Sequence, residues 1–280
     1  MKVLVTGAAG QLGREVCRQL WRRGADCVAA DARRLDVTDG RAVAQALMAL
    51  RPQGVIHCAA WTAVDAAETQ PERCMAVNAA GTANLAAACQ AAGAKLLYVS
   101  TDYVFDGERR GAYTPEDRTG PLNVYGESKR TGERAVRMLS ERYFIVRTAR
   151  LFGGSGENFV RTMLRLGTDR RQLGVVADQI GSPTYARDLA KLLCAMIETE
   201  AYGIYHTVNE GACSWAELAE RTFTLAGMDV RVIPLKTEDY PLPAARPKNT
   251  RLDTWCLPET GFCRLPPWQE ALERYLREDE

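Results

Sequence analysis

Short apolar runs alternate with longer amphipathic segments over the first 150 residues of the chain. The runs have the length of buried strands, whereas the longer segments repeat their apolar positions every three or four residues, as helices do. Continuously apolar strands that alternate with helices predict an α/β fold with a doubly wound, Rossmann-like parallel sheet. The predicted strands are 3–6, 27–30, 55–57, 96–100 and 144–147, and the predicted helices are 11–23, 42–50, 76–92 and 125–141.

After about residue 150 this alternation loosens. A glycine-rich stretch at 153–158 precedes a predicted helix at 159–166, and further helices are expected from about 186 and over 268–277. The four prolines within 229–250 predict extended or looped chain there. We therefore expect a dinucleotide-binding domain over 1–150, to which 178–208 returns, and a smaller interleaved substrate-binding domain over 151–177 and 209–280.

Three glycines directly after the first predicted strand form the pattern Gly7-x-x-Gly10-x-x-Gly13. The pattern ends a strand and opens a helix, where glycines allow a tight turn and let backbone N–H groups approach a pyrophosphate. The spacing differs from the GxGxxG of the plain Rossmann fingerprint. The strand–turn–helix context nevertheless predicts dinucleotide binding at this loop.

The end of the second predicted strand carries opposing signals about the cofactor. Asp31 can accept hydrogen bonds from the adenosine ribose, which favours NAD, whereas Arg33 and Arg34 can pair with the 2′-phosphate of NADP. The sequence therefore leaves NADH and NADPH both open. Asp36 and Val37 are expected near the adenine, although Asp36 can equally be a turn or helix-cap residue.

A tyrosine and a lysine lie one helical turn apart in "PLNVYGESK", residues 121–129. Tyr125 and Lys129 share a helix face, and Thr101 ends the preceding strand, at the sheet edge where ligands bind. A nearby ammonium stabilises phenolate and lowers the tyrosine pKa from its ordinary value near ~10. Alone, the pair also fits a solvated helix face. With the glycine loop, it predicts proton delivery to a substrate oxygen during hydride transfer.

Composition and charge narrow the possible partners and location. The 280-residue chain has a net charge of +1, which predicts no nucleic-acid partner. Nine cysteines without a CxxC pair, several in apolar runs, indicate reduced core thiols, and two histidines in apolar context argue against a structural zinc site. No signal peptide and no apolar stretch of ~18 residues is apparent. We therefore expect a cytoplasmic protein without a membrane partner.

The order of glycine loop, threonine and YxxxK resembles the extended short-chain dehydrogenase/reductase superfamily. Five further stretches are more specific: "STDYVFDG", "PLNVYGESKRTGE", "DQIGSPTYARDLA", "GIYHTVNEG" with "SWAELA", and "RPKNTRLDT". They resemble the dTDP-4-dehydrorhamnose reductase family, over residues 1 to about 275. The resemblance implies NADPH- or NADH-dependent reduction of the C4 ketone of dTDP-4-dehydro-L-rhamnose to dTDP-L-rhamnose, by a monomer or homodimer.

This resemblance, together with the glycine loop, implies roles for individual residues. The catalytic residues are Tyr125 as proton donor, Lys129 as its partner and Thr101, which tunes both. The implied cofactor contacts are Gly7, Gly10, Gln11, Leu12, Gly13, Asp31, Asp36, Val37, Ala60, Thr62, Tyr125 and Lys129. The implied substrate contacts are Val64, Thr101, Asp102, Tyr103 and Arg150.

The chain departs from the family's pattern at two places. Where the family often has tryptophan in "RTSWVY", this sequence reads "RTARLF" and places Arg150 there, so a cation replaces a stacking surface. Some members hold Mg²⁺ between subunits with glutamates from two helices. Glu15 matches the first of these, but Arg187 stands at the second, so we expect no bound metal.

Other functions within and beyond the superfamily stay open. Related dehydratases read Thr-Asp-Glu, whereas Tyr103 here supplies no carboxylate, which argues against elimination. A nucleotide-sugar epimerase would retain its cofactor and show no net oxidation. A non-catalytic subunit resembling the regulatory subunit of methionine adenosyltransferase can keep the same tyrosine and lysine. Cofactor consumption with a nucleotide ketosugar separates these possibilities.

Overall fold

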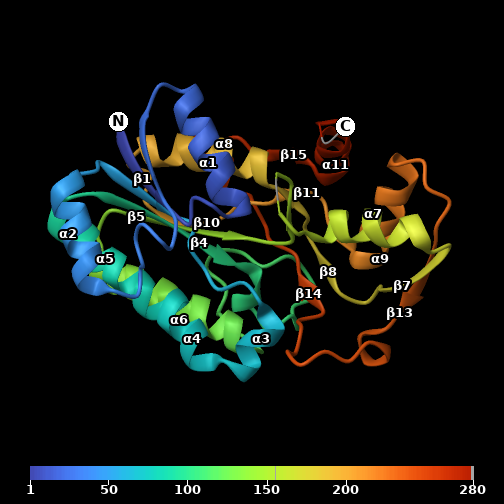
Figure 1. The fold of residues 1–280 in the computed structure, drawn as a ribbon. Coiled ribbons are helices and arrows are strands. Elements are labelled where there is room, and N and C mark those ends of the chain that lie inside the picture. The colour runs from blue at the N-terminus through green and yellow to red at the C-terminus, as the bar shows by residue number, and fades with distance from the viewer. Residues whose placement is uncertain (155, 279–280) are drawn as a thin grey trace.

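A six-stranded parallel sheet forms the centre of the protein (Figure 1). The structure, a computed structural model, describes residues 1–154 and 156–278. The strand order is β10-β5-β4-β3-β1-β2, so the chain reverses its winding direction between β1 and β3, as the predicted doubly wound fold requires. The strands are β1 Lys2–Thr6, β2 Asp26–Ala30, β3 Gly54–His57, β4 Lys95–Thr101, β5 Tyr143–Thr148 and β10 Gly203–His206.

Helices cover both faces of this sheet. Leu12, Val16 and Leu20, spaced four residues apart, are buried beneath α1 and join a core shared with α8. A second core lies under the helices of the opposite face, and Figure 1 shows those helices on the other side of the sheet from α1 and α8. The helices are α1 Gln11–Arg22 and α8 Ala186–Glu198 on one face, and α2 Gly40–Leu50, α5 Gly81–Ala92 and α6 Val124–Leu139 on the other. No helix within the described residues is long and apolar enough to cross a membrane.

The predicted helix over 76–92 differs from the observed one. Helical chain begins earlier, with α4 Pro71–Met75, and passes through a π-helical turn, Ala76–Ala80, before α5. Proline is well suited to the first position of a helix, because its missing N–H needs no partner there. The wide π turn carries Asn78, a fully buried amide whose hydrogen bonds reach beyond the helix.

The second half of the chain supplies short strands and further helices, which lie beside the carboxyl edge of the main sheet (Figure 1). The domain boundaries expected from the sequence stay a prediction, although β10 does join the main sheet. The small sheets pair β7 with β13, β6 with β9, β11 with β15, and β8 with both β12 and β14. The strands are β6 Leu151–Phe152, β7 Gln172–Val176, β8 Ile180–Gly181, β9 Thr184–Tyr185, β11 Asn209–Glu210, β12 Cys213–Ser214, β13 Arg231–Leu235, β14 Asn249–Thr250 and β15 Leu265–Pro267. The helices are α3 Val64–Thr69, α7 Phe159–Asp169, α9 Trp215–Leu225, α10 Cys256–Glu259 and α11 Trp268–Glu278, with 3₁₀ turns at Asp102–Val104 and Thr237–Asp239.

The cysteines behave as the sequence predicted. All nine are free thiols, and Cys17 and Cys194, which lie in apolar runs, are buried in the core between α1, α8 and the sheet. Cys263 is exposed. The cysteines thus contribute apolar packing and no cross-link.

Candidate active site

In the glycine loop between β1 and α1, two of the glycines, Gly7 and Gly13, have no room for a side chain. Gly7 adopts a left-handed φ of 65°, and a Cβ built on it lies 2.5 Å from the Ala59 nitrogen. A Cβ on Gly13 lies 2.2 Å from the Gly7 carbonyl oxygen. These contacts force glycine at both positions and bring backbone close to any ligand above the loop.

The first turn of α1 is built to receive an anion. Its N-cap, Gly10, offers no side-chain hydrogen bond, and no acidic residue lies in the first turn. The Gln11 Nε2 atom is buried and has no hydrogen-bond partner. Unsatisfied N–H groups and the positive end of the helix dipole favour a phosphate at this position. The residues present therefore fit the pyrophosphate of a dinucleotide.

A cavity of about 450 Å³ extends from this loop along the carboxyl edge of the sheet. It brings together most of the residues predicted from the sequence, although they come from five separate segments of the chain. The predicted residues that line it are Gly10, Gln11, Leu12, Gly13, Ala60, Thr62, Val64, Thr101, Asp102, Tyr103, Tyr125, Lys129 and Arg150.

Four predicted cofactor residues lie outside this cavity: Gly7, Asp31, Asp36 and Val37. The Asp31 carboxylate accepts hydrogen bonds from the backbone N–H groups of Arg33 and Arg34, so it orders the loop after β2. Asp36 accepts hydrogen bonds from the Thr38 N–H and hydroxyl, which lower its pKa and make it the turn residue that the sequence left open. Val37 is buried in the core. Their contacts with a cofactor stay predictions.

The loop that carries Ala60 and Thr62 is held by a residue that the sequence analysis missed. Asn78 accepts a hydrogen bond from the Trp61 N–H at 2.8 Å and donates to the Trp61 carbonyl at 3.0 Å. Its amide also donates to Ser128 Oγ on α6 at 2.9 Å. The sequence feature that could have indicated this role is the lone asparagine in the alanine-rich stretch "AVNAAG". Asn78 thus fixes the cavity wall to the helix that carries the tyrosine and lysine.

The start of α6 places Tyr125 at the end of β4. The Asn123 side chain caps the helix by accepting the Gly126 N–H at 2.8 Å. A Cβ on Gly126 would lie 2.2 Å from the Tyr103 carbonyl oxygen, so only glycine allows this close approach. Lys129, one turn later, donates from Nζ to the Val99 carbonyl at 2.6 Å.

The electrostatics of this pair differ from the simple expectation. Desolvation raises the pKa of Tyr125 above its ordinary value, and the Thr101 hydroxyl opposes the rise through a hydrogen bond. Burial outweighs any lowering of the Tyr125 pKa by Lys129, whose ammonium donates to the backbone of β4. Burial lowers the pKa of Lys129 to about 7. The tyrosine is therefore firmly protonated and ready to act as an acid.

Arg150 lies at the edge of the cavity in a left-handed conformation, with φ of 45°. Its guanidinium donates to the carbonyls of Cys213 at 2.7 Å and Gln179 at 2.8 Å. It also stacks on the ring of Trp215, 4.2 Å from the centroid. Trp215 lines the same cavity and was not predicted as a site residue. An aromatic surface is thus present beside Arg150, supplied by α9.

Two neighbouring predicted residues, Asp102 and Tyr103, have raised pKa values. Burial raises the pKa of Asp102 to about 6, against the opposing effects of Thr250 and Arg150. Burial also raises the pKa of Tyr103 to about 12. Near neutral pH the Tyr103 phenol is therefore neutral and the Asp102 carboxyl is mostly ionised, so both can hydrogen-bond a sugar hydroxyl.

Comparisons with known proteins agree with this geometry. A family model described as the RmlD substrate binding domain matches residues 1–280. The chain is 47% identical over 276 residues to dTDP-4-dehydrorhamnose reductase of Streptomyces griseus, covering 96% of this chain and 91% of the relative. The chain belongs to the dTDP-4-dehydrorhamnose reductase family.

Two further members or relatives of this family sharpen the comparison. The crystal structure of dTDP-4-dehydrorhamnose reductase from Bacillus anthracis in complex with NADP is 46% identical, with a TM-score of 0.97 over 99% of this chain and 100% of that chain. The dTDP-4-keto-6-deoxy-D-glucose reductase of Streptomyces niveus is 40% identical and covers 96% of this chain and 94% of the relative. The family therefore includes relatives named for more than one ketosugar.

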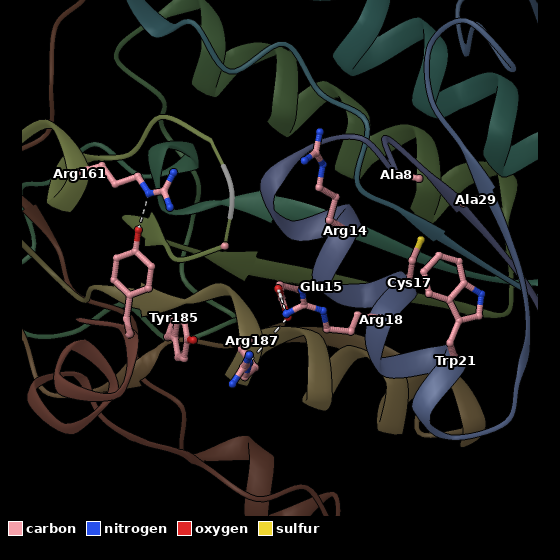
Figure 2. A pocket seen from close by; sticks show the side chains of 12 residues that line it. Ala8, Arg14, Glu15, Cys17, Arg18, Trp21, Ala29, Arg161, Tyr185 and Arg187 are labelled. Carbon is pink, nitrogen blue, oxygen red and sulfur yellow. Dashed lines mark hydrogen bonds and ion pairs between the residues drawn. The ribbon is translucent and has the colours of Figure 1, made fainter. Parts of the chain in front are cut away.

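A second, larger cavity of about 580 Å³ lies on the outer side of α1 (Figure 2). It contains Glu15, the residue that matches a metal ligand of some family members. Arg187 Nε lies 3.9 Å from Glu15 Oε2, and Arg18 donates to Oε1 at 3.2 Å. No group of three or more metal-ligating side chains occurs within residues 1–154 and 156–278. The expected lack of a metal bridge stays a prediction, supported by the two arginines at the carboxylate.

Proposed function

We propose that the protein reduces the C4 ketone of dTDP-4-dehydro-L-rhamnose to dTDP-L-rhamnose, with NADPH or NADH as reductant. The observation that carries this proposal is the convergence of Thr101, Tyr125 and Lys129 in one cavity with an anion-binding glycine loop. Family membership, with relatives that are named as reductases and one that is solved with NADP, supports it.

The chain's own residues supply the acid and its surroundings. Bound reduced nicotinamide supplies the hydride. Tyr125 donates its phenolic proton to the oxygen of the ketone as the carbon is reduced, and the Thr101 hydroxyl orients both oxygens. The resulting phenolate is costly in a desolvated wall, so the ammonium of Lys129 is needed to stabilise it. Gln11 and the first N–H groups of α1 would hold the pyrophosphate.

We assign substrate contacts to Val64, Thr101, Asp102, Tyr103 and Arg150, which line the cavity. A second candidate substrate is dTDP-4-keto-6-deoxy-D-glucose, because a relative named for that sugar is 40% identical. Both substrates present a C4 ketone, so the same acid serves either reduction.

The test is oxidation of NADPH or NADH, followed by absorbance, with each ketosugar and without sugar. Consumption that depends on the sugar, with one product identified by NMR, supports a reductase and selects its substrate. Sugar isomerisation without net cofactor oxidation would instead indicate an epimerase. Measurable cofactor binding with no turnover of any ketosugar would favour a regulatory subunit.

We infer a cytoplasmic location from the nine free cysteines, which a reducing compartment preserves. A monomer or homodimer remains our expectation for the assembly. Light scattering of the purified protein distinguishes these two states.

A further inference from the structure

Helix α6 faces the end of β4 through side chains spaced four residues apart, Tyr125, Lys129 and Glu133. The first two belong to the active site, whereas Glu133 has no role in the mechanism above. Lys129 donates to the Val99 carbonyl, and Ser100, the next residue of β4, donates its hydroxyl to Glu133 Oε1 at 2.6 Å. Two neighbouring contacts thus fix the end of the strand to the catalytic helix.

The Glu133 carboxylate is buried, and both of its oxygens accept hydrogen bonds. The side chain of Arg147 donates from Nε to Oε1 at 2.9 Å and from Nη2 to Oε2 at 2.8 Å. Arg147 is itself 3% exposed and donates to the Pro115 carbonyl at 3.1 Å. Three donors, two of them from one guanidinium, thus satisfy the carboxylate oxygens.

Lys129 needs a compensating charge because it is 2% exposed. Burial lowers its pKa from 10.5 to about 7, and the Glu133 carboxylate is the largest influence in the opposite direction. Near neutral pH the lysine is therefore close to losing its proton. Removing a negative charge nearby would lower the Lys129 pKa further and favour the neutral amine.

The other titratable groups around Lys129 carry no charge that could replace Glu133. Burial lowers the pKa of the nearby histidine to about 3 and raises the pKa values of the thiols and phenols. These groups thus offer Lys129 no replacement for the Glu133 carboxylate, which is the largest influence that raises the lysine pKa. The neutral groups are His57 on β3, Cys58 after β3, Cys74 on α4, Tyr98 on β4 and Tyr125 on α6.

We propose that Glu133 is the positioning residue of Lys129: its buried carboxylate keeps the lysine cationic and holds the end of β4 against α6. The proposal rests on the reductase function above, in which the Lys129 ammonium stabilises the phenolate left on Tyr125. Glu133 does not line the active-site cavity but reaches a separate cavity behind it, so it acts through Lys129 and not on the substrate.

The first test is Glu133→Gln, which keeps the shape of the side chain and removes its charge. In the unsubstituted protein, the rate should fall as pH rises through the pKa of Lys129, because Tyr125 loses its proton only at higher pH. Removing the negative charge lowers the lysine pKa, so this limb of the kcat profile should move to lower pH by about one unit. At the alkaline end the rate should be about tenfold lower, and at the acid end the rates should converge.

Two further variants separate charge from folding. Glu133→Gln combined with Arg147→Gln leaves no unpaired guanidinium in the core, and its limb should lie between those of Glu133→Gln and the unsubstituted protein. Arg147→Gln alone leaves the carboxylate unneutralised and should move the limb to higher pH. Opposite shifts cannot arise from general destabilisation. Coincident limbs in all folded variants and the unsubstituted protein would overturn the proposal.

A matched control is Asp188→Asn on α8. Asp188 is also a buried carboxylate, 4% exposed and paired with Arg274 at 2.5 Å, but it lies outside the active-site cavity. This variant should lose stability without moving the pH limb. The Lys129 ε-carbon resonance, titrated by NMR in each protein with NADPH bound, needs no turnover. An unchanged lysine titration in Glu133→Gln contradicts the role of Glu133, whereas absence of turnover in the unsubstituted protein contradicts the reductase function.

Discussion

Helix α1 separates two cavities of different character. The outer cavity is larger, about 580 Å³, and is lined by four arginines together with exposed Trp21. Some of its charges reach water, as Arg18 does with 51% of its side chain exposed, although Glu15 is buried. The inner cavity is about 450 Å³ and contains Lys129, which is 2% exposed.

This difference shows that the pKa values of titratable groups depend on how far the groups are desolvated and not on the volume of the cavity. In the inner cavity, burial moves the pKa values of Lys129 and Asp102 to about 7 and about 6. Perturbed groups of this kind cluster at functional sites because a low-dielectric wall strengthens each charge interaction. Where charges are exposed, water and salt screen them, so they shift neighbouring pKa values less. Paired substitutions in the two cavities test the contrast.

The largest expected effect is that of Tyr125→Phe. The ring keeps its packing, but the proton donor is lost, so kcat should fall by roughly 10²–10⁴-fold while cofactor affinity stays unchanged. Steady-state kinetics and cofactor fluorescence titration measure the two quantities. Substantial residual activity would assign the proton to Tyr103 or to water.

The matched substitution in the outer cavity is Tyr275→Phe. It removes the hydroxyl that accepts a hydrogen bond from Arg161 at 3.0 Å, so the free energy of unfolding should fall by about 1 kcal/mol. The value of kcat should stay unchanged. A loss of activity comparable to that of Tyr125→Phe would remove the distinction between the cavities.

Lys129→Met should lower kcat by about 10²-fold and also weaken cofactor binding. The ammonium would no longer stabilise the phenolate, and a predicted contact with the nicotinamide ribose would be lost. Arg18→Met in the outer cavity is the control and should change neither quantity. If Lys129→Met and Tyr125→Phe bind the cofactor equally well, the lysine has no ribose contact.

Arg150→Ala should raise KM for the ketosugar by about tenfold, or ~1.4 kcal/mol, with a smaller change in cofactor affinity. The guanidinium would no longer orient Trp215 or face the substrate. Arg187→Ala in the outer cavity should leave KM within twofold. The same small change for Arg150→Ala would place that residue outside the site.

The smallest expected effect is the difference between NADH and NADPH, less than about tenfold in kcat/KM, or ~1.4 kcal/mol. Asp31 favours the free ribose hydroxyls, while Arg33 and Arg34 lie on the exposed loop after β2 and tolerate a 2′-phosphate. Comparing the two cofactors at saturating sugar measures the ratio. A preference of a hundredfold or more in either direction contradicts this balance.

The main sheet and its helices were predictable because their signals are local. Runs such as 96–99 are apolar throughout, and Leu12, Val16 and Leu20 mark one helix face. Most strands of the second half have only two or three residues, and β8 pairs with partners more than 30 residues away. A pair of residues has no periodicity, so no pattern in the sequence could reveal these strands.

The candidate site divides in the same way. Thr101, Tyr125 and Lys129 were predictable because one strand end and one helical spacing define them. The placement of Asn78, and of Trp215 beside Arg150, depends on contacts between distant segments. Asp36 was expected either near the adenine of the cofactor or in a turn, and its hydrogen bond from the Thr38 N–H shows the turn. Propensity and spacing say which residues can act, and tertiary contacts decide which ones meet.

Arg150 has a further consequence for engineering and evolution. A non-glycine residue at φ of 45° costs on the order of 1 kcal/mol of conformational energy. Glycine or asparagine would relieve this strain but would remove a guanidinium that makes two hydrogen bonds and a ring contact, and losing these outweighs the gain. Substitutions that raise the thermal stability of this chain should therefore be sought away from residue 150. Turnover should be measured for each of them at the same time.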